Sequence, residues 1–325
     1  MNIEMIRSAE LRFLGNVRKT PLLNSSFIDD IAGRRVWVKA EALQHTGSFK
    51  FRGGWSAISS LSEETRQRGV IAFSSGNHAQ GIALAARMHN ISAVIVMPAD
   101  APSLKIDNTR ALGAEVVLYD RETEDREEIG QTIANERGLT LIKPYDEPQV
   151  IAGQGTCGLE IAEQALQLGV DAAEVLVCCG GGGLTSGIAL ALEATAPNMK
   201  VRPVEPVNFD DVARSLASGE PQTNAKTTGG ICDAIITPTP GTITFPIMKR
   251  LCGAGIVVPE EDCLRAMSVA FTRLKIVLEP GGAIALAAAL YHKDVISSEE
   301  VICIASGGNV DPKIFKQSLI DYPCK

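Results

Sequence analysis

Short apolar segments alternate with longer amphipathic segments along most of the chain, and this pattern predicts its secondary structure. Residues 35–40 alternate between polar and apolar side chains, as a half-buried strand does, whereas residues 70–73 are apolar throughout. Strands are expected at residues 35–40, 70–73, 93–98, 115–119, 139–142, 175–179, 200–204 and 301–305. Helices are expected near residues 3–16, 50–61, 78–88, 103–112, 122–136, 150–167, 184–195, 260–275 and 282–291.

This alternation predicts an α/β protein with parallel sheets. Strands that are apolar on both faces must be covered on both faces, and the helices between them provide that cover. We predict two lobes, each an open, mostly parallel sheet flanked by helices, with a ligand cleft between them at the carboxyl ends of the strands. The smaller lobe is expected at residues 67–146 and the larger one at residues 1–66 and 147–325, with the Gly-, Thr- and Pro-rich stretch 219–245 as a long loop.

Composition and charge argue against several classes of protein. The formal net charge is −7 without any basic run, which disfavours nucleic acid or an anionic membrane as the main partner. No apolar stretch approaches the roughly 18 residues of a membrane span, and residues 1–7 mix charges without the apolar segment of a signal peptide. The eight cysteines form no C-x-x-C motif, so we expect buried, reduced thiols in a cytoplasmic protein rather than disulfides or a zinc site.

The stretch from Thr46 to Gly53 places a lysine between two aromatic residues, directly before a predicted helix. Lys50 has Phe49 and Phe51 as its neighbours. Apolar surroundings favour the neutral amine, which can form a Schiff base with a carbonyl compound. Taken alone, the stretch also fits a surface lysine near the start of a helix.

Two loops that follow predicted strands can bind anions. Ser74 to His78 combines small polar residues with a helix start, whose free amides suit a carboxylate, although a plain N-cap also explains it. Gly180 to Gly183 follows the strand at 175–179 and opens a helix, so its amides can wrap a phosphate. A flexible loop is the alternative for the glycine run.

The glycine run differs from both common nucleotide-binding motifs. No Gly-Lys-Ser/Thr follows it, so it is not a Walker loop, and Thr185 stands where a dinucleotide fingerprint has its third glycine. Glu205 nevertheless lies at the end of the next predicted strand, where a ribose-binding acid belongs in a dinucleotide fold. A nicotinamide oxidoreductase therefore stays an alternative.

Two further stretches carry polar side chains at strand ends. Ser306 follows the last predicted strand, where its hydroxyl is either a neutral hydrogen-bond partner or part of a Gly-Gly-Asn turn. Glu205 to Asp211 gathers carboxylates around the Phe209 carbonyl, a set of hard oxygen ligands suited to Mg²⁺ or Ca²⁺. Acidic residues at a helix N-terminus explain the same pattern.

Together these motifs resemble the fold-type II pyridoxal-phosphate enzymes, specifically the serine/threonine dehydratase and serine racemase family. The resemblance runs from about Thr20 to Asp311. It rests on Thr46-Gly47-Ser48-Phe49-Lys50-Phe51-Arg52-Gly53, Ser74-Ser75-Gly76-Asn77-His78-Ala79-Gln80-Gly81, Val150-Ile151-Ala152-Gly153-Gln154-Gly155-Thr156, Gly180 to Gly183, and Ser306-Gly307-Gly308-Asn309-Val310-Asp311. It implies a fold like that of the tryptophan synthase β subunit, with pyridoxal 5′-phosphate as the cofactor.

The resemblance also implies cofactor-binding roles. Lys50 resembles the Schiff-base lysine of the family, and Phe49 the residue that packs on the cofactor ring. Asn77 resembles the amide that bonds the phenolic oxygen of the cofactor, and Ser306 the partner of its pyridine nitrogen. The phosphate cradle of the family is matched by Gly180, Gly181, Gly182 and Gly183.

Substrate-binding roles follow from the same resemblance. Ser75, Asn77 and His78 stand where the family holds the substrate carboxylate. Ser75 also resembles the second acid/base of serine racemase, facing the side of Cα opposite to Lys50. Arg126 falls where serine racemase has a substrate-contacting arginine, although a solvated helix charge explains it as well.

On this basis we expect a pyridoxal-phosphate-dependent β-elimination that converts a β-hydroxy amino acid to a 2-oxo acid and ammonia. Threonine, serine, 3-hydroxyaspartate and bulkier relatives are the expected substrates, and an amino-acid racemase or a non-catalytic amino-acid-binding or phosphate-binding protein are alternatives. Glu205, the Phe209 carbonyl and Asp211 match the divalent-metal site of the racemase-like and hydroxyaspartate-dehydratase branch. The family also implies a homodimer.

Overall fold

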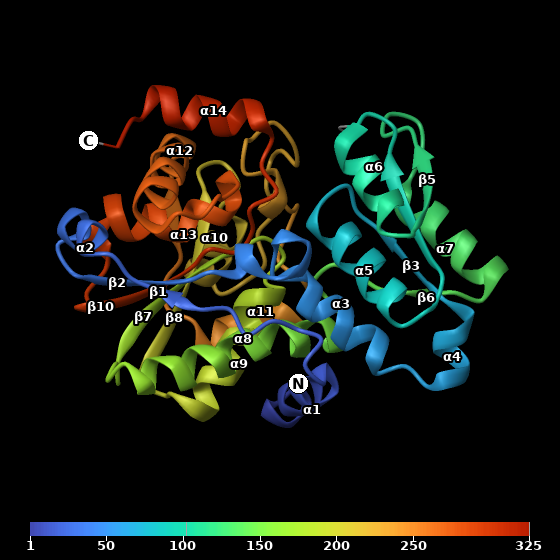
Figure 1. Cartoon of the computed structure of the whole chain (residues 1–325), viewed down its shortest axis with the longest axis horizontal. Coiled ribbons are helices and arrows are strands. Elements are labelled where there is room, and N and C mark those ends of the chain that lie inside the picture. The colour runs from blue at the N-terminus through green and yellow to red at the C-terminus, as the bar shows by residue number, and fades with distance from the viewer. Residues whose placement is uncertain (102, 325) are drawn as a thin grey trace.

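The computed structural model describes residues 1–101 and 103–324, which build two sheets side by side (Figure 1). The six-stranded sheet has, in spatial order, β1 (Leu22–Leu23), β2 (Arg35–Lys39), β10 (Glu300–Ile304), β7 (Ala173–Cys178), β8 (Met199–Pro206) and β9 (Ile256–Val258). The four-stranded sheet has β5 (Glu115–Tyr119), β4 (Ala93–Pro98), β3 (Val70–Phe73) and β6 (Thr140–Leu141). Only the β1–β2 pair is antiparallel among these strands. The predicted α/β class is therefore confirmed.

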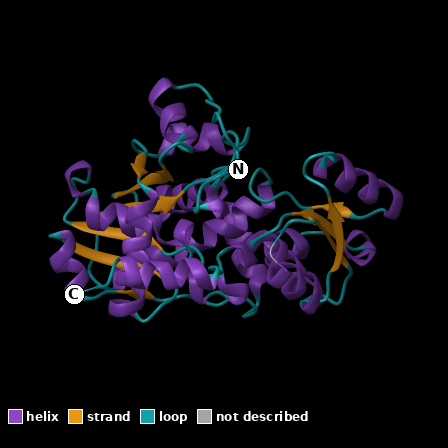
Figure 2. Cartoon of the chain, turned by 90° about the horizontal axis from the view of Figure 1, so that it is seen from above, coloured by secondary structure: helices purple, strands orange, loops and turns teal. Residues whose placement is uncertain are grey.

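Helices cover both sheets, as the apolar strands require (Figure 2). Around the six-stranded sheet lie α1 (Ile3–Phe13), α2 (Ser26–Ala32), α3 (Lys50–Ser59), α8 (Pro148–Gln167), α9 (Gly183–Thr195), α10 (Asp211–Ser218), α11 (Thr244–Leu251), α12 (Glu260–Val269), α13 (Pro280–Tyr291) and α14 (Pro312–Asp321). Around the four-stranded sheet lie α4 (Glu63–Arg68), α5 (Asn77–Met88), α6 (Ser103–Ala111) and α7 (Arg126–Arg137). The smaller sheet is thus built between residues 70 and 141, while the exact lobe boundaries stay a prediction.

Several boundaries differ from the sequence-based expectation. Helix α1 ends at Phe13, because Leu14 adopts a left-handed conformation with φ +47°. Helix α7 begins only at Arg126, because the Asp125 side chain caps it by accepting from two backbone N–H groups. The expected loop at 219–245 is shorter, since α11 begins at Thr244, and the chain also forms α2, α4, α10, α14 and β9, which were not predicted.

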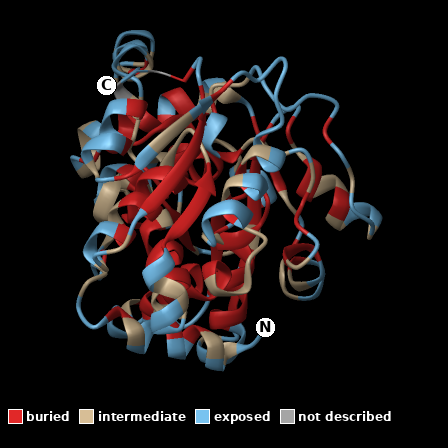
Figure 3. Ribbon diagram, turned by 90° about the vertical axis from the view of Figure 1, so that its right-hand side faces the viewer, coloured by how far each residue is buried: buried red, intermediate tan, exposed pale blue. Residues whose placement is uncertain are grey.

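The strands in the interior are largely buried (Figure 3). Close contacts with two neighbouring helices, α5 and α8, fix the position of α3, which begins with Lys50. A Cβ atom at Gly153 of α8 would lie 2.5 Å from the Arg52 carbonyl oxygen, so α3 and α8 approach as closely as glycine allows. A Cβ atom at Gly81 of α5 would lie 3.1 Å from the backbone of Lys50. Helix α3 is therefore held between both lobes, and small displacements of its first turn are resisted.

Across residues 1–101 and 103–324, no helix combines the length and the apolar character needed to span a membrane.

Candidate active site

A strained turn leads into Lys50. Thr46 has φ +58° and Gly47 has φ +72°, so two successive residues occupy the left-handed region directly before α3. This conformation is unfavourable for threonine, which has a Cβ atom. Ser48 pairs with Gly307 in an isolated bridge, and this pairing ties the turn to the loop after β10.

The amine of Lys50 has unusual surroundings for a lysine. Its Nζ donates a hydrogen bond to the Pro144 carbonyl oxygen at 2.9 Å and lies 5.3 Å from the ring centroid of Phe49. Burial lowers the pKa of Lys50 to about 8, and the nearby Cys178 and Glu279 oppose this shift only in part. A substantial fraction of the amine is therefore neutral near physiological pH, as nucleophilic and general-base chemistry requires.

The glycine loop between β7 and α9 has no room for side chains. A side chain at Gly181 would collide with the ring of Tyr145, and a Cβ atom at Gly180 would lie 2.9 Å from the Ile235 carbonyl oxygen. Gly182 adopts φ +89°, which favours glycine. Because α9 begins at Gly183, its first amides lack partners within the helix and are available to an anion.

Two buried polar side chains along the same cavity have hydrogen-bonding capacity left over. Among the described residues, both amide atoms of Gln154 are buried without a hydrogen bond, and the Thr185 hydroxyl has only a weak interaction with the Cys179 thiol. Both residues line a cavity of about 210 Å³ together with Lys50 and the glycine loop. Unsatisfied buried polar atoms are rare in native proteins, so these groups fit a bound polar ligand such as a phosphate ester.

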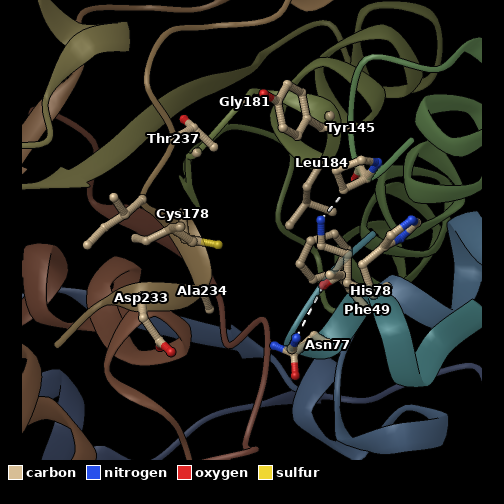
Figure 4. Close-up of a pocket in the computed structure, with 18 of the residues that line it drawn as sticks. Phe49, Asn77, His78, Tyr145, Cys178, Gly181, Leu184, Asp233, Ala234 and Thr237 are labelled. Atoms are coloured by element: carbon tan, nitrogen blue, oxygen red, sulfur yellow. Dashed lines mark hydrogen bonds between the residues drawn. The ribbon is translucent and has the colours of Figure 1, made fainter. Parts of the chain in front are cut away.

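The segment from Ser74 to His78 forms one wall of this cavity and opens α5 (Figure 4). His78 Nε2 lies 3.0 Å from the Ile142 carbonyl oxygen, which can only accept, so Nε2 carries the proton and the buried Nδ1 is a free acceptor. Burial, and then the charge of Lys50, lower the pKa of His78 to about 3. His78 is thus a neutral ring whose side chain contributes no positive charge to the site.

Glu279, which had no assigned role in the sequence interpretation, is a buried carboxyl in the same cavity. It stands directly before α13, and its Oε1 accepts a hydrogen bond from Asn77 Nδ2 at 2.6 Å, a bond drawn dashed in Figure 4. Burial raises the pKa of Glu279 to about 7, although the bond from Asn77 opposes the shift. Glu279 also lines a second cavity of about 430 Å³, whose lining includes Asn309 from the loop after β10.

Three charged side chains stand at the rim of the cavity. Arg126, the first residue of α7, is exposed and has its guanidinium carbon 5.4 Å from the ring centroid of Phe73. Lys105 of α6 pairs with Asp233 across the two lobes, with 3.3 Å between Nζ and Oδ2. No carboxylate of residues 1–101 or 103–324 forms an ion pair with Arg126.

Ser306 is not itself among the lining residues of the cavity, but it contacts two of them, Phe49 and Cys178. It is buried at the end of β10, and its carbonyl oxygen accepts from the backbone N–H of Phe49 at 3.1 Å. It also bonds the thiol of Cys178, which does line the cavity and whose pKa is raised by burial to about 11. The structure therefore brings Phe49, Lys50 and the glycine loop directly together and places Ser306 beside them.

The predicted metal ligands lie at the end of β8 and the start of α10. The Glu205 carboxylate accepts from the backbone N–H groups of Val212 and Ala213 at 3.0 and 2.6 Å. Asp211 Oδ1 accepts from Asn224 at 2.5 Å, whereas Asp211 Oδ2 is buried without a partner among the described residues.

Both of these carboxyl groups are hard to ionise where they stand. Burial, followed by repulsion from Asp211, raises the pKa of Glu205 well above its usual range, and burial raises the pKa of Asp211 to about 6. Within the part of the chain that the structure describes, no three His, Cys, Asp or Glu side chains gather into a metal-binding cluster. A metal site here would need the Phe209 carbonyl and water as further ligands.

The fold and this site define an α/β enzyme that holds a phosphorylated cofactor beside a reactive lysine. Residues 13–307 match the family described as pyridoxal-phosphate dependent enzyme. The chain belongs to this family, which confirms the predicted cofactor and disfavours the nicotinamide alternative.

Individual relatives are similar over almost the whole chain. An L-threo-3-hydroxyaspartate ammonia-lyase from Saccharomyces cerevisiae is 44% identical over 308 residues, which cover 95% of this chain and 93% of the relative. A serine racemase from Schizosaccharomyces pombe is 42% identical, covering 94% of this chain and 93% of the relative. The crystal structure of a threonine deaminase from T.th. has a TM-score of 0.90 at 42% identity, covering 96% of this chain and 99% of that one.

Proposed function

We propose that the protein is a pyridoxal-phosphate-dependent ammonia-lyase that eliminates water from a β-hydroxy amino acid and yields a 2-oxo acid and ammonia. The observation that carries this proposal is the Lys50 amine, with its pKa lowered to about 8, beside a glycine loop without room for side chains. An ammonia-lyase and a threonine deaminase are among the similar proteins, which supports the same reaction class.

The cofactor would be held by residues from four loops. The amides of Gly180 to Gly183, with the Thr185 hydroxyl, would bind its phosphate, and Phe49 would pack on its ring. Asn77 would donate to its phenolic oxygen, and Ser306 would face its pyridine nitrogen. When bound, pyridoxal phosphate acts as the electron sink for the bond broken at Cα.

Groups of the protein itself then remove the α-proton and bind the substrate carboxylate. Lys50 removes the α-proton as the general base, since its neutral amine is populated near pH 8. Ser75, in the loop before α5, and the first amides of α5 at Asn77 and His78 hold the substrate carboxylate, while the neutral His78 ring adds no charge. The β-hydroxyl group leaves, and hydrolysis of the unsaturated product yields the oxo acid and ammonia.

We propose 3-hydroxyaspartate as the preferred substrate. Arg126 lines the cavity without an ion-pair partner in the described chain, so a guanidinium is available for a second carboxylate. A relative that is 44% identical to this chain is named for L-threo-3-hydroxyaspartate. Threonine and serine lack a second carboxylate and would interact more weakly with Arg126.

Racemisation is the second candidate. Ser75 lines the cavity with Lys50, and a hydroxyl on the other side of Cα can return the proton with inverted configuration. A serine racemase is among the similar proteins.

A divalent cation, Mg²⁺ or Ca²⁺, is proposed at Glu205, the Phe209 carbonyl and Asp211. The support is the pairing of two buried carboxyl groups with raised pKa values and the unpartnered Asp211 Oδ2, since a cation would relieve both features.

The assembly and the location are proposals as well. A homodimer is supported by the exposed Leu11 and Leu14 at the end of α1, which are 76% and 83% exposed. Residues 67–146 are proposed as the domain that closes over the substrate, because Lys105 and Arg126 reach the rim from α6 and α7. A cytoplasmic location is supported by eight free cysteines.

Oxo-acid release from a substrate panel tests this function. L- and D-serine, L- and D-threonine, the 3-hydroxyaspartates and phenylserine should be compared, each with Mg²⁺ and with EDTA. We expect the fastest release from a 3-hydroxyaspartate, with a loss in EDTA. Inversion of a chiral amino acid without oxo acid would instead favour the racemase, and a colourless protein that gains no colour with pyridoxal phosphate would exclude both.

A further inference from the structure

Three amide and carboxyl side chains form a hydrogen-bonded chain with a defined direction along one wall of the active site. Asn309 Nδ2 donates to the Thr46 carbonyl oxygen and to Asn77 Oδ1, each at 2.7 Å. Asn77 Nδ2 in turn donates to Glu279 Oε1 at 2.6 Å. Residues more than 200 positions apart in the sequence are thus joined, since Asn77 is separated from Glu279 by 202 positions and from Asn309 by 232.

The donor-to-acceptor direction of these hydrogen bonds follows from the groups at the two ends of the series. The Thr46 carbonyl oxygen has no proton to give, so Asn309 must present its nitrogen there, and the same nitrogen then donates to Asn77. Asn77 must therefore present its oxygen to Asn309 and its nitrogen to Glu279, whose carboxylate accepts. The Thr46 carbonyl is always an acceptor, and the ionised Glu279 carboxylate accepts at the other end, so together they determine which way the Asn77 amide is turned.

The backbone around these three side chains leaves room for the hydrogen bonds between them. A Cβ atom at Gly307 would collide with Glu279 Oε1 and lie 3.2 Å from Asn77 Nδ2, so only glycine leaves room for the bond between them. The Glu279 backbone N–H also donates to the Gly307 carbonyl oxygen at 3.1 Å. At the other end, the bond from Asn309 holds Thr46 in its left-handed conformation, four residues before Lys50.

We propose that Asn309 and Glu279 are positioning residues that fix the Asn77 amide so that its second N–H points into the cavity. An amide nitrogen has two hydrogens, and Glu279 takes one of them. The other is left on a side chain that lines the cavity, where it can donate to an anionic oxygen of the bound cofactor. Reversing the amide would present a lone pair to that oxygen instead. This inference rests on the proposed function only for the identity of that oxygen.

Two substitutions at position 309 distinguish the effect of the orientation of the Asn77 amide from the effect of losing the Asn309 hydrogen bonds. Neither Asn309→Ala nor Asn309→Asp can donate to Thr46, so both lose that bond equally. In Asn309→Ala the Asn77 amide keeps Glu279 as its acceptor and stays correctly turned. In Asn309→Asp two carboxylates compete for the same amide nitrogen, and the amide reverses in a large share of molecules. We expect Asn309→Asp to weaken pyridoxal phosphate binding at least tenfold more than Asn309→Ala does.

A compensating second substitution makes the test independent of charge. Asn309→Asp with Glu279→Gln has the same net charge as the wild type, and the amide introduced at position 279 can donate to a reversed Asn77. This double variant should regain melting temperature relative to Asn309→Asp, in a full cycle that includes Glu279→Gln alone. Its cofactor affinity and its rate of oxo-acid release should stay at least tenfold below those of the wild type.

The measurements are the dissociation constant of pyridoxal phosphate from the cofactor-free protein, by fluorescence titration, and the melting temperature of each variant. Recovery of cofactor affinity in the double variant would overturn the inference, because charge rather than amide direction would then explain the loss. Equal affinities of the two position-309 variants would overturn it as well. If the wild type bound cofactor but released no oxo acid, the proposed function would fail while the order of affinities still tested this inference.

Discussion

Arg52 and Lys50 are two basic residues on the first turn of α3, and their surroundings shift their pKa values in opposite directions. Arg52 is fully buried, bonds Glu41 at 2.8 Å and Glu160 at 2.7 Å, and these carboxylates raise its pKa although burial alone would lower it. Lys39 joins the same network through Glu160 at 2.6 Å, so two cations meet two carboxylates. Lys50 has only a carbonyl oxygen as its hydrogen-bond partner among the described residues, and its pKa falls.

One helix therefore supports both stability and chemistry. A paired, fully bonded cation stays protonated and anchors the helix to Glu41, which follows β2, and to α8, whereas an amine without a carboxylate bonded to it is free to lose its proton. Glu279, a buried acid of the same cavity, bonds Asn77 instead of Lys50. The reactive group therefore sits on a rigid element while its own environment is left unsatisfied.

The largest effect is expected from removing the unpaired amine. Lys50→Ala should lower turnover by several orders of magnitude, because the general base and the nucleophile are lost together. Lys50→Arg is the matched control, since a guanidinium keeps the charge but stays protonated. Circular dichroism should show an unchanged fold in both variants, and full turnover in Lys50→Ala would refute the role of Lys50.

Removing the paired cation should affect stability instead. Arg52→Ala leaves Glu41 buried without a bonded cation and leaves Glu160 with Lys39 alone, and we expect a loss of about 3–5 kcal/mol in the free energy of unfolding. Urea denaturation of the cofactor-free protein measures this loss. Arg68→Ala, which breaks an exposed pair, should cost less than about 1 kcal/mol. Similar losses in the two variants would contradict the role of the buried network around Arg52 as the anchor of α3.

The unpaired acid of the cavity should destabilise the protein at high pH. Since burial raises the pKa of Glu279 to about 7, the folded state binds more protons than the unfolded state between about pH 4.3 and that value. Stability is therefore lost as pH rises through this window. Glu279→Gln should raise the free energy of unfolding by up to about 3 kcal/mol at pH 8, with a smaller gain at pH 5.

Urea titrations of the cofactor-free protein at pH 5 and pH 8 measure this gain. Glu64→Gln, at an exposed position, is the control for the substitution itself, and we expect it to change the free energy of unfolding much less than Glu279→Gln does at pH 8. A Glu279→Gln gain that is equal at both pH values would mean that the carboxyl group is already ionised at pH 5.

The smallest predicted change concerns the unpaired cation at the rim. Arg126→Gln should raise the KM for 3-hydroxyaspartate about tenfold and leave that for threonine nearly unchanged, because only the first substrate has a second carboxylate. Arg121→Gln is the control, since Arg121 pairs with Asp100 and is not among the residues that line the cavity. Equal effects on both substrates would remove the proposed preference.

Much of this architecture was predictable from sequence. Apolar runs of four to six residues identified the long parallel strands, and the local motifs at Lys50 and at Gly180 to Gly183 carry their chemistry within a few neighbouring residues. Helix α14 was missed although Asp311 and Pro312 form a good helix start. Strand β9 has only three residues, too few for a periodic pattern.

The roles of Glu279 and Asn309 could not be predicted from local patterns. Each looks like ordinary helix-start or turn chemistry in its own segment. Their function depends on contacts with Asn77 across more than 200 positions, which only the folded chain creates. The same holds for the lowered pKa of Lys50, because its burial is a property of the packed lobes.

The most direct test of the contrast between Lys50 and Arg52 is the pH dependence of covalent pyridoxal phosphate attachment to the cofactor-free protein. Borohydride fixes the attached cofactor, and peptide mass mapping then identifies the lysine. We predict attachment at Lys50, rising with pH to half its maximum near pH 8. Attachment at another lysine, or a midpoint near about pH 10 as for an ordinary amine, would contradict it.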